Sequence, residues 1–142
     1  MSETARQRNS ETAIKPGNGK PPVRTFHDLI AWQRAMELAE AVYHATKQLP
    51  ESEEFGLTSQ LRRAVVSIPS NIAEGHARQA RADFLRFLRI ARGSVAEVST
   101  QIELACRLRF LPEDPQLQGL IAEVARILQA LIRSLEAKER ST

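Results

Sequence analysis

Serine and histidine side chains that cluster near the middle of the chain are the first candidates for nucleophilic chemistry. Ser67 and Ser70 precede His76 in the stretch SIPSNIAEGH. A nucleophile needs a base within hydrogen-bonding reach and a third group that orients the base, and closeness along the chain does not supply that geometry. Since no set of acid, base and nucleophile stands out elsewhere, the sequence predicts no catalytic residues and a protein that is not an enzyme.

The histidine and cysteine spacing argues against a metal site. Di-metal helical bundles use Glu-x-x-His pairs, and none of the three histidines has a glutamate three positions before it. Cys106 is the single cysteine, so no second thiolate is present for a metal or a disulfide, and its place near an apolar helix face predicts a buried, inert thiol. We expect no metal, and without a glycine-rich phosphate loop we expect no cofactor.

Arginines on the third predicted helix are the first feature that suggests binding. They fall within an arc of about 140° on a helical wheel, away from the apolar seam: Arg78, Arg81, Arg86, Arg89 and Arg92. Guanidinium groups in a row can contact a nucleic-acid backbone without reading its sequence. The alternative is an ordinary solvated face, because the chain has 16 Arg and only 4 Lys.

A strip of small residues lies on the outward side of the same helix. Gly93, Ala96 and Thr100 fall within about 60° of one another. An exposed glycine in a helix costs about 1 kcal/mol relative to alanine, and small side chains allow another backbone to approach closely. The strip is therefore a candidate oligomer interface, and tolerated surface composition is the alternative.

Four amphipathic segments must position these side chains, over about residues 28–49, 55–77, 80–109 and 115–138. Asp28 and Asp114 are expected to cap the first and fourth helices, and Pro50 to end the first. The last three segments carry apolar stripes at three- and four-residue steps, such as Phe84 to Ala105 in the third. The first is expected to bury one face: Leu29, Trp32, Met36, Ala39, Tyr43 and Thr46. With no strand pattern, the fold class is all-α, an antiparallel up-down-up-down four-helix bundle.

Pro69 interrupts the apolar stripe of the second helix, where it removes one backbone hydrogen bond and costs roughly 3 kcal/mol unless compensated. Ser67 and Ser70 are expected to reach the freed backbone groups, and Asn71 with Glu74 to restart the helix as a capping box. We therefore interpret the stretch as a bend within one helix, with intersubunit hydrogen bonding as the alternative role. The motif consists of Ser67, Pro69, Ser70, Asn71, Glu74 and Gly75.

The net charge of +3 comes from the first 25 residues, which contain five basic and two acidic side chains. They are polar and rich in glycine and proline, so we expect a disordered basic tail over residues 1–25 and a neutral bundle domain over residues 26–140. No apolar run is long enough for a membrane span, and the low cysteine content is typical of a reducing compartment. We expect a cytoplasmic protein with no membrane partner.

Three stretches resemble one bacterial family. FHDLIAWQRAMELAEAVYHATKQLP, FGLTSQLRRAVVSIPSNIAEG and FLRFLRIARGSVAEVSTQIELA are similar to the four-helix-bundle proteins encoded in intervening sequences of 23S ribosomal RNA genes. The resemblance covers roughly residues 26–135, and the segment at 67–75 is its most specific part.

That resemblance implies an all-α bundle without known catalytic residues. The family is related to the accessory variability determinant of diversity-generating retroelements, a homopentamer that binds a reverse transcriptase and nucleic acid through a basic surface. By resemblance we expect a homo-oligomer, a pentamer, that acts as an accessory protein for RNA or DNA and a protein partner such as a reverse transcriptase. The alternative is a protein–protein interaction scaffold without nucleic-acid affinity, which the neutral charge of the predicted domain favours.

Overall fold

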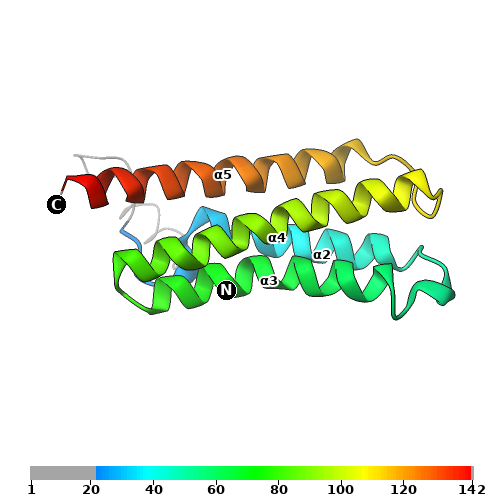
Figure 1. Cartoon of the computed structure of the whole chain (residues 1–142), viewed down its shortest axis with the longest axis horizontal. Helices are drawn as coiled ribbons and strands as arrows, with labels where there is room; N and C mark the ends of the chain where they lie inside the picture. The colour runs from blue at the N-terminus through cyan, green and yellow to red at the C-terminus, as the bar shows by residue number, and fades with distance from the viewer. Residues whose placement is uncertain (1–21, 142) are drawn as a thin grey trace, which may run out of the picture.

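Four long helices run side by side along the molecule (Figure 1) in the computed structural model, which describes residues 22–141. They are α2 (Ile30–Thr46), α3 (Leu57–Ala77), α4 (Arg81–Arg107) and α5 (Pro115–Arg140), and the short 3-10 turns η1 (Phe26–Asp28) and η2 (Glu51–Glu53) precede α2 and α3. Each helix packs against its neighbours in the chain, and α2 also packs against α5. The predicted all-α four-helix bundle is confirmed. Of the predicted tail, residues 1–21 lie outside the described residues.

The connections divide between the two ends of the bundle. The α2–α3 and α4–α5 connections lie at one end, and the α3–α4 turn lies at the other end together with the C-terminal end of α5 (Figure 1). Side chains near the α3–α4 turn can therefore meet the last turns of α5, and η2 lies a full helix length away from them.

The start of α5 follows the capping rules, because the Asp114 carboxylate accepts a hydrogen bond from Leu117 N at 3.2 Å and Pro115 occupies the first helical position. Helix α4 ends at Arg107, two residues before the predicted end, and Leu108 is its C-cap. Arg109 adopts a left-handed backbone conformation with φ of 64°. Its N–H donates to Cys106 O, and the N–H of Phe110 donates to Ala105 O, which is the Schellman pattern.

Asp28 does not cap α2, contrary to the sequence prediction. Its carboxylate accepts hydrogen bonds from Arg24 N at 2.9 Å and Thr25 N at 3.2 Å, as part of a capping box around η1. These two hydrogen bonds lower the pKa of Asp28. The N-cap residue of α2 is Leu29, whose side chain makes no capping hydrogen bond. Arg24 and Thr25, which the sequence analysis assigned to the tail, are thus tied to the first turn of the bundle.

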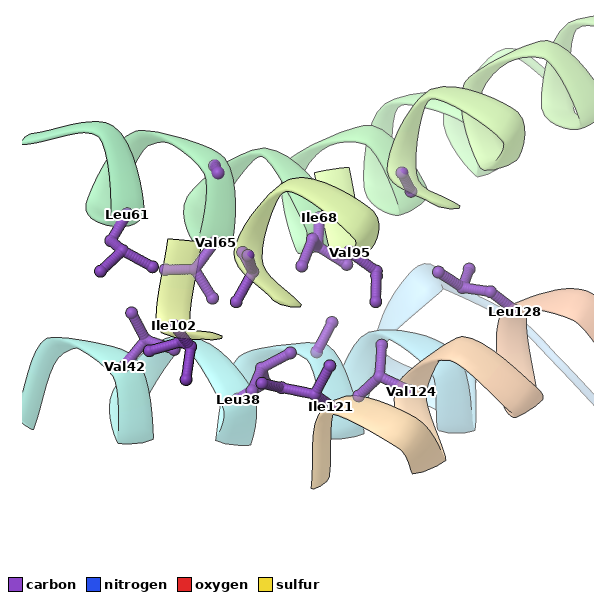
Figure 2. Close-up of a cluster of buried hydrophobic side chains, with 14 of the residues drawn as sticks. Leu38, Val42, Leu61, Val65, Ile68, Val95, Ile102, Ile121, Val124 and Leu128 are labelled. Carbon is purple, nitrogen blue, oxygen red and sulfur yellow. The ribbon is translucent and has the colours of Figure 1, made fainter. Parts of the chain in front are cut away.

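The core is formed by one apolar stripe from each helix (Figure 2), including Leu38 of α2, Val65 of α3, Val95 of α4 and Val124 of α5. The predicted stripes of α3 and α4 are buried as expected, apart from half-buried Phe84. In α5, the stripe expected from the sequence runs through Leu131 and Leu135, but these two are only half-buried, and Ile132 is fully buried instead.

The predicted core face of α2 is partly wrong. Thr46 is buried, and Leu29, Trp32 and Ala39 pack half-buried against the core, but Met36 and Tyr43 are exposed. The helix buries Ala31, Ala35, Leu38, Val42 and Thr46, whereas Met36 and Tyr43 are each 40% exposed. The cause is that α2 carries two apolar stripes, and the larger side chains lie on the one turned toward α3 and the surface. There Arg62 of α3 lies over the Tyr43 ring, 4.6 Å from its centroid, and exposed Val66 follows one turn later.

Candidate nucleic-acid interface

The five arginines predicted to form one ridge separate into two groups. Arg81, Arg89 and Arg92 reach across to α5. Arg89 Nη2 lies 2.8 Å from Glu136 Oε2, Arg92 donates to Gln129 Oε1 at 2.9 Å, and Arg81 lies 4.0 Å from Glu139 Oε1. These cations hold the α4–α5 seam in addition to facing solvent.

Arg78, the residue after α3, and Arg86 of α4 both lie over the ring of Phe87. Their guanidinium carbons are 5.2 and 4.5 Å from the ring centroid, and Phe87 is only 7% exposed. Arg78 also pairs with Glu74 at 3.1 Å. The predicted single ridge is therefore corrected to a seam group and a pair that covers an aromatic side chain.

A second row of arginines, on α5, was missed by the sequence analysis. Arg126, Arg133 and Arg140 are exposed and repeat every seven residues. Arg133 and Arg140 each follow by four residues a side chain that is bonded to α4, namely Gln129 and Glu136. Residues four apart share one side of a helix, so the row lies beside the arginines of α4. The seven-residue spacing was the signal that could have revealed it.

We call the combined surface the arginine face: Arg81, Arg89 and Arg92 from α4, and Arg126, Arg133 and Arg140 from α5. Two glutamates lie within it, Glu136 and Glu139, and both approach arginines. The hydrogen bond from Arg89 and the positive charges of Arg89, Arg140 and Arg92 lower the pKa of Glu136. Six cations against two carboxylates leave a local excess of positive charge, although the bundle as a whole is neutral.

The Pro69 segment lies inside one continuous helix, as expected. Its side chains make different hydrogen bonds from those predicted. Ser67 Oγ is 2.9 Å from Ser94 Oγ of α4, and Asn71 Nδ2 donates to Ser67 O at 2.7 Å and to Ser67 Oγ at 2.9 Å. Ser94 is 5% exposed. The cluster therefore links α3 to α4 within one chain.

The predicted capping box is not formed, because Asn71 turns back to Ser67 and Glu74 pairs with Arg78. Ser70 is exposed, and its hydroxyl makes no hydrogen bond to the rest of residues 22–141. Neither Ser67 nor Ser70 is bonded to His76, whose ring meets the Phe84 ring edge-on at 5.6 Å. The segment thus brings no nucleophile and base together.

At Gly75 of α3, the chain leaves no space for a side chain between α3 and α4. A Cβ at this position would lie 2.7 Å from Phe87 Cβ and 3.1 Å from Phe84 Cδ1. A Cβ cannot rotate away, so any larger residue would push the two helices apart. The last residue of the motif is glycine because of this contact.

The small-residue strip lies on the exposed side of α4. A Cβ on Gly93 would meet nothing within 4 Å, and Thr100 Oγ1 donates to Ala96 O at 2.8 Å. A shallow hollow of about 270 Å³ runs past these residues, between Glu97 and Gln101. The strip is open to another molecule, and its role as an interface stays a prediction.

Metal-binding clusters and membrane-spanning helices are both absent from residues 22–141. This part of the chain has no group of three or more His, Cys, Asp or Glu side chains placed to hold a metal, and none of its helices is long and apolar enough to cross a membrane. The Cys106 thiol is half-buried and donates to Pro112 O at 3.6 Å. Burial, and after it the charges of Glu113, Asp114 and Glu103, raises the pKa of this thiol.

Comparison with known proteins identifies the family to which the chain is similar. The model of the family described as 23S rRNA-intervening sequence protein matches residues 27–133. A similar solved structure is the crystal structure of a protein with unknown function from the S23 ribosomal protein family of Bacteroides thetaiotaomicron. It is 28% identical, covers 72% of this chain and 98% of its own, and superposes with a TM-score of 0.65. No curated protein matches the chain.

Proposed function

The chain belongs to the 23S rRNA-intervening sequence protein family, and from that premise we propose that it is a cytoplasmic, non-enzymatic, oligomeric accessory protein that binds nucleic acid through the arginine face. The observation that carries this proposal is the juxtaposition of arginines from α4 and α5. Arginines seven residues apart on a helix are separated by about 10.5 Å, which is the rise of about three base pairs of duplex. The face therefore suits the backbone of a duplex or a structured RNA, without base readout.

Self-association is part of the proposal, and exposed apolar surface supports it. Met36 and Tyr43 of α2 and Val66 of α3 are apolar and each 40–41% exposed, and a Cβ on Gly93 of α4 would meet nothing within 4 Å. In a ring of copies, each arginine face would be repeated around the assembly, which strengthens the field that a polyanion meets. The pentamer and the reverse-transcriptase partner rest on the resemblance to the retroelement accessory protein.

A protein scaffold without nucleic-acid affinity is the second candidate. It is supported by the contacts of Arg89, Arg92 and Arg81, which already reach α5 side chains. Arginines that hold two helices together through such contacts are explained without a ligand. Arg126 and Arg133, which have no ion pair within residues 22–141, separate the two candidates.

Salt-dependent binding tests the proposal. Duplex DNA and a structured RNA are titrated with the protein at increasing salt, using the wild type and the double variant Arg126→Gln/Arg133→Gln. The wild type should bind with a steep salt dependence, and losing two phosphate contacts should reduce the slope of log K against log salt by about 1.8 for DNA.

The matched control is Arg63→Gln/Arg109→Gln, which removes the same charge from residues outside the arginine face that also lack ion pairs within residues 22–141. If the wild type fails to bind at low salt, nucleic-acid binding is refuted and the scaffold is favoured. If the control weakens binding as much as the test pair does, the arginine face is the wrong surface.

A further inference from the structure

Phe55 is the most exposed large apolar side chain among the described residues, with 90% of its surface accessible. It lies between η2 and α3, and the backbone on both sides is tied down. Gly56 N donates to Glu53 O at 3.0 Å, and the Glu53 carboxylate accepts from Leu57 N at 3.0 Å. Because the backbone around Phe55 is already fixed, little backbone entropy is lost when a partner buries the ring.

The loop around Phe55 is strongly acidic. Glu51, Glu53 and Glu54 precede it with no basic residue among them. The Glu53 carboxylate is hydrogen-bonded to the backbone within the loop. Glu51 and Glu54 are exposed and have no ion pair within residues 22–141. A partner surface for this loop should therefore offer an apolar hollow flanked by cations.

Such a hollow exists at the opposite end of the bundle. A cavity of about 470 Å³ opens between the end of α3, the start of α4 and the last turns of α5. Phe84 and Leu135 supply its apolar wall, and His76, Arg81 and Lys138 its basic rim. Lys138 has no ion pair within residues 22–141, and the Arg81 contact with Glu139 is long at 4.0 Å.

The cavity has room for an aromatic ring, because a protein cavity of about 150 Å³ is enough for benzene. The chain's own Phe55 cannot occupy it, since α3 separates them: its 21 residues span about 31 Å. Any Phe55 that enters the cavity must belong to another molecule.

We propose that the Phe55 loop of one copy seats in the cavity between α3, α4 and α5 of a second copy, with Glu51 and Glu54 facing Arg81 and Lys138. The occupant is assigned by complementarity, because this chain supplies both the acidic aromatic loop and the basic apolar cavity. Since the loop and the cavity lie at opposite ends of the bundle (Figure 1), the contact is head-to-tail: the loop of each copy enters the cavity of the next, and contacts of this kind can close into a ring. The assignment rests on the self-association proposed above and names a contact that carries it.

Photo-crosslinking tests where Phe55 goes. A benzophenone side chain is placed at position 55 of the full-length protein, which is mixed with ¹⁵N-labelled wild type, irradiated and analysed by mass spectrometry. Crosslinks between a labelled and an unlabelled copy, at residues 75–84 or 135–138, are expected. Crosslinks confined to one copy or mapping to other surfaces would overturn the proposal, as would capture of a different protein when the experiment is run in cells.

Sedimentation supplies a second readout. Phe55→Ala should weaken self-association roughly 10- to 100-fold, and Leu108→Ala, another exposed apolar residue, should not. Lys138→Glu should also weaken it, and adding Glu54→Lys to Lys138→Glu should restore it. If the wild type self-associates and Phe55→Ala does so equally well, this contact is wrong while the proposed oligomer stands. A wild type that is monomeric at all concentrations would refute both the contact and the proposed oligomer. Nucleic-acid binding is measured in a separate experiment.

Discussion

Gly75→Ala should destabilise the bundle through the contact between α3 and α4. The added Cβ would lie 2.7 Å from Phe87 Cβ and 3.1 Å from Phe84 Cδ1. Because Phe87 Cβ moves only with the backbone of α4, the helices must separate, and overpacking of this kind costs about 1–3 kcal/mol. Alanine also gains about 1 kcal/mol over glycine in helix propensity. We expect a net loss of up to about 2 kcal/mol and a drop in Tm of up to about 6 °C.

Gly93→Ala is the matched control, since it makes the same chemical change in a helix where the new Cβ meets nothing within 4 Å. It should stabilise the protein by up to about 1 kcal/mol. Urea unfolding followed by circular dichroism at 222 nm, at one fixed protein concentration, measures both variants. If Gly75→Ala is as stable as Gly93→Ala, the close approach of α3 and α4 at Gly75 is refuted.

Three further outcomes can be measured on single variants or on the wild type. Arg109→Gly should stabilise the protein by about 1 kcal/mol in urea unfolding, because glycine adopts the left-handed conformation at φ 64° without strain; an unchanged midpoint would contradict this account of the end of α4. Cys106 should react with a disulfide reagent more slowly than free cysteine at neutral pH, since burial raises the pKa of its thiol; a rate equal to that of free cysteine would argue for an accessible thiolate. The pKa of Glu136 is lower in the folded state, so its contribution to stability is present at neutral pH and fades as the pH falls below about 4.3, the unfolded value. Glu136→Gln should therefore lose less stability than the wild type between pH 7 and pH 3, and it should bind duplex DNA more tightly at low salt.

The sequence predicted elements better than it predicted surfaces. The seams of α4 and α5 repeat strictly, and the buried positions Leu88 and Leu128 follow from that repeat. The face of α2 is predicted incorrectly at Met36 and Tyr43, because they form a second apolar stripe beside the buried one that contains Ala31 and Ala35. Periodicity finds apolar stripes, and only packing decides which of two stripes enters the core.

The arginine face could be predicted only in part, because the spacing of charges along one helix does not show which side chains of another helix lie beside it. Arg89 and Arg92 were singled out on α4, but their contacts with Glu136 and Gln129 depend on how α5 lies beside them. The same pairing brings in Arg133. Likewise, Asn71 and Ser67 were assigned to local repair of the helix, whereas Ser94, 27 residues away from Ser67, completes the cluster.

The order of packing around the bundle also bears on how the chain folds. Three of the four helix pairs, α2–α3, α3–α4 and α4–α5, join consecutive helices through short connections, so they form at a small cost in loop-closure entropy. Only α2–α5 joins segments that are far apart in the chain. The tight α3–α4 hairpin, held by Gly75 and the Ser67–Ser94 hydrogen bond, is the natural nucleus. We expect α2 and α5 to dock last, with their interactions absent from the transition state.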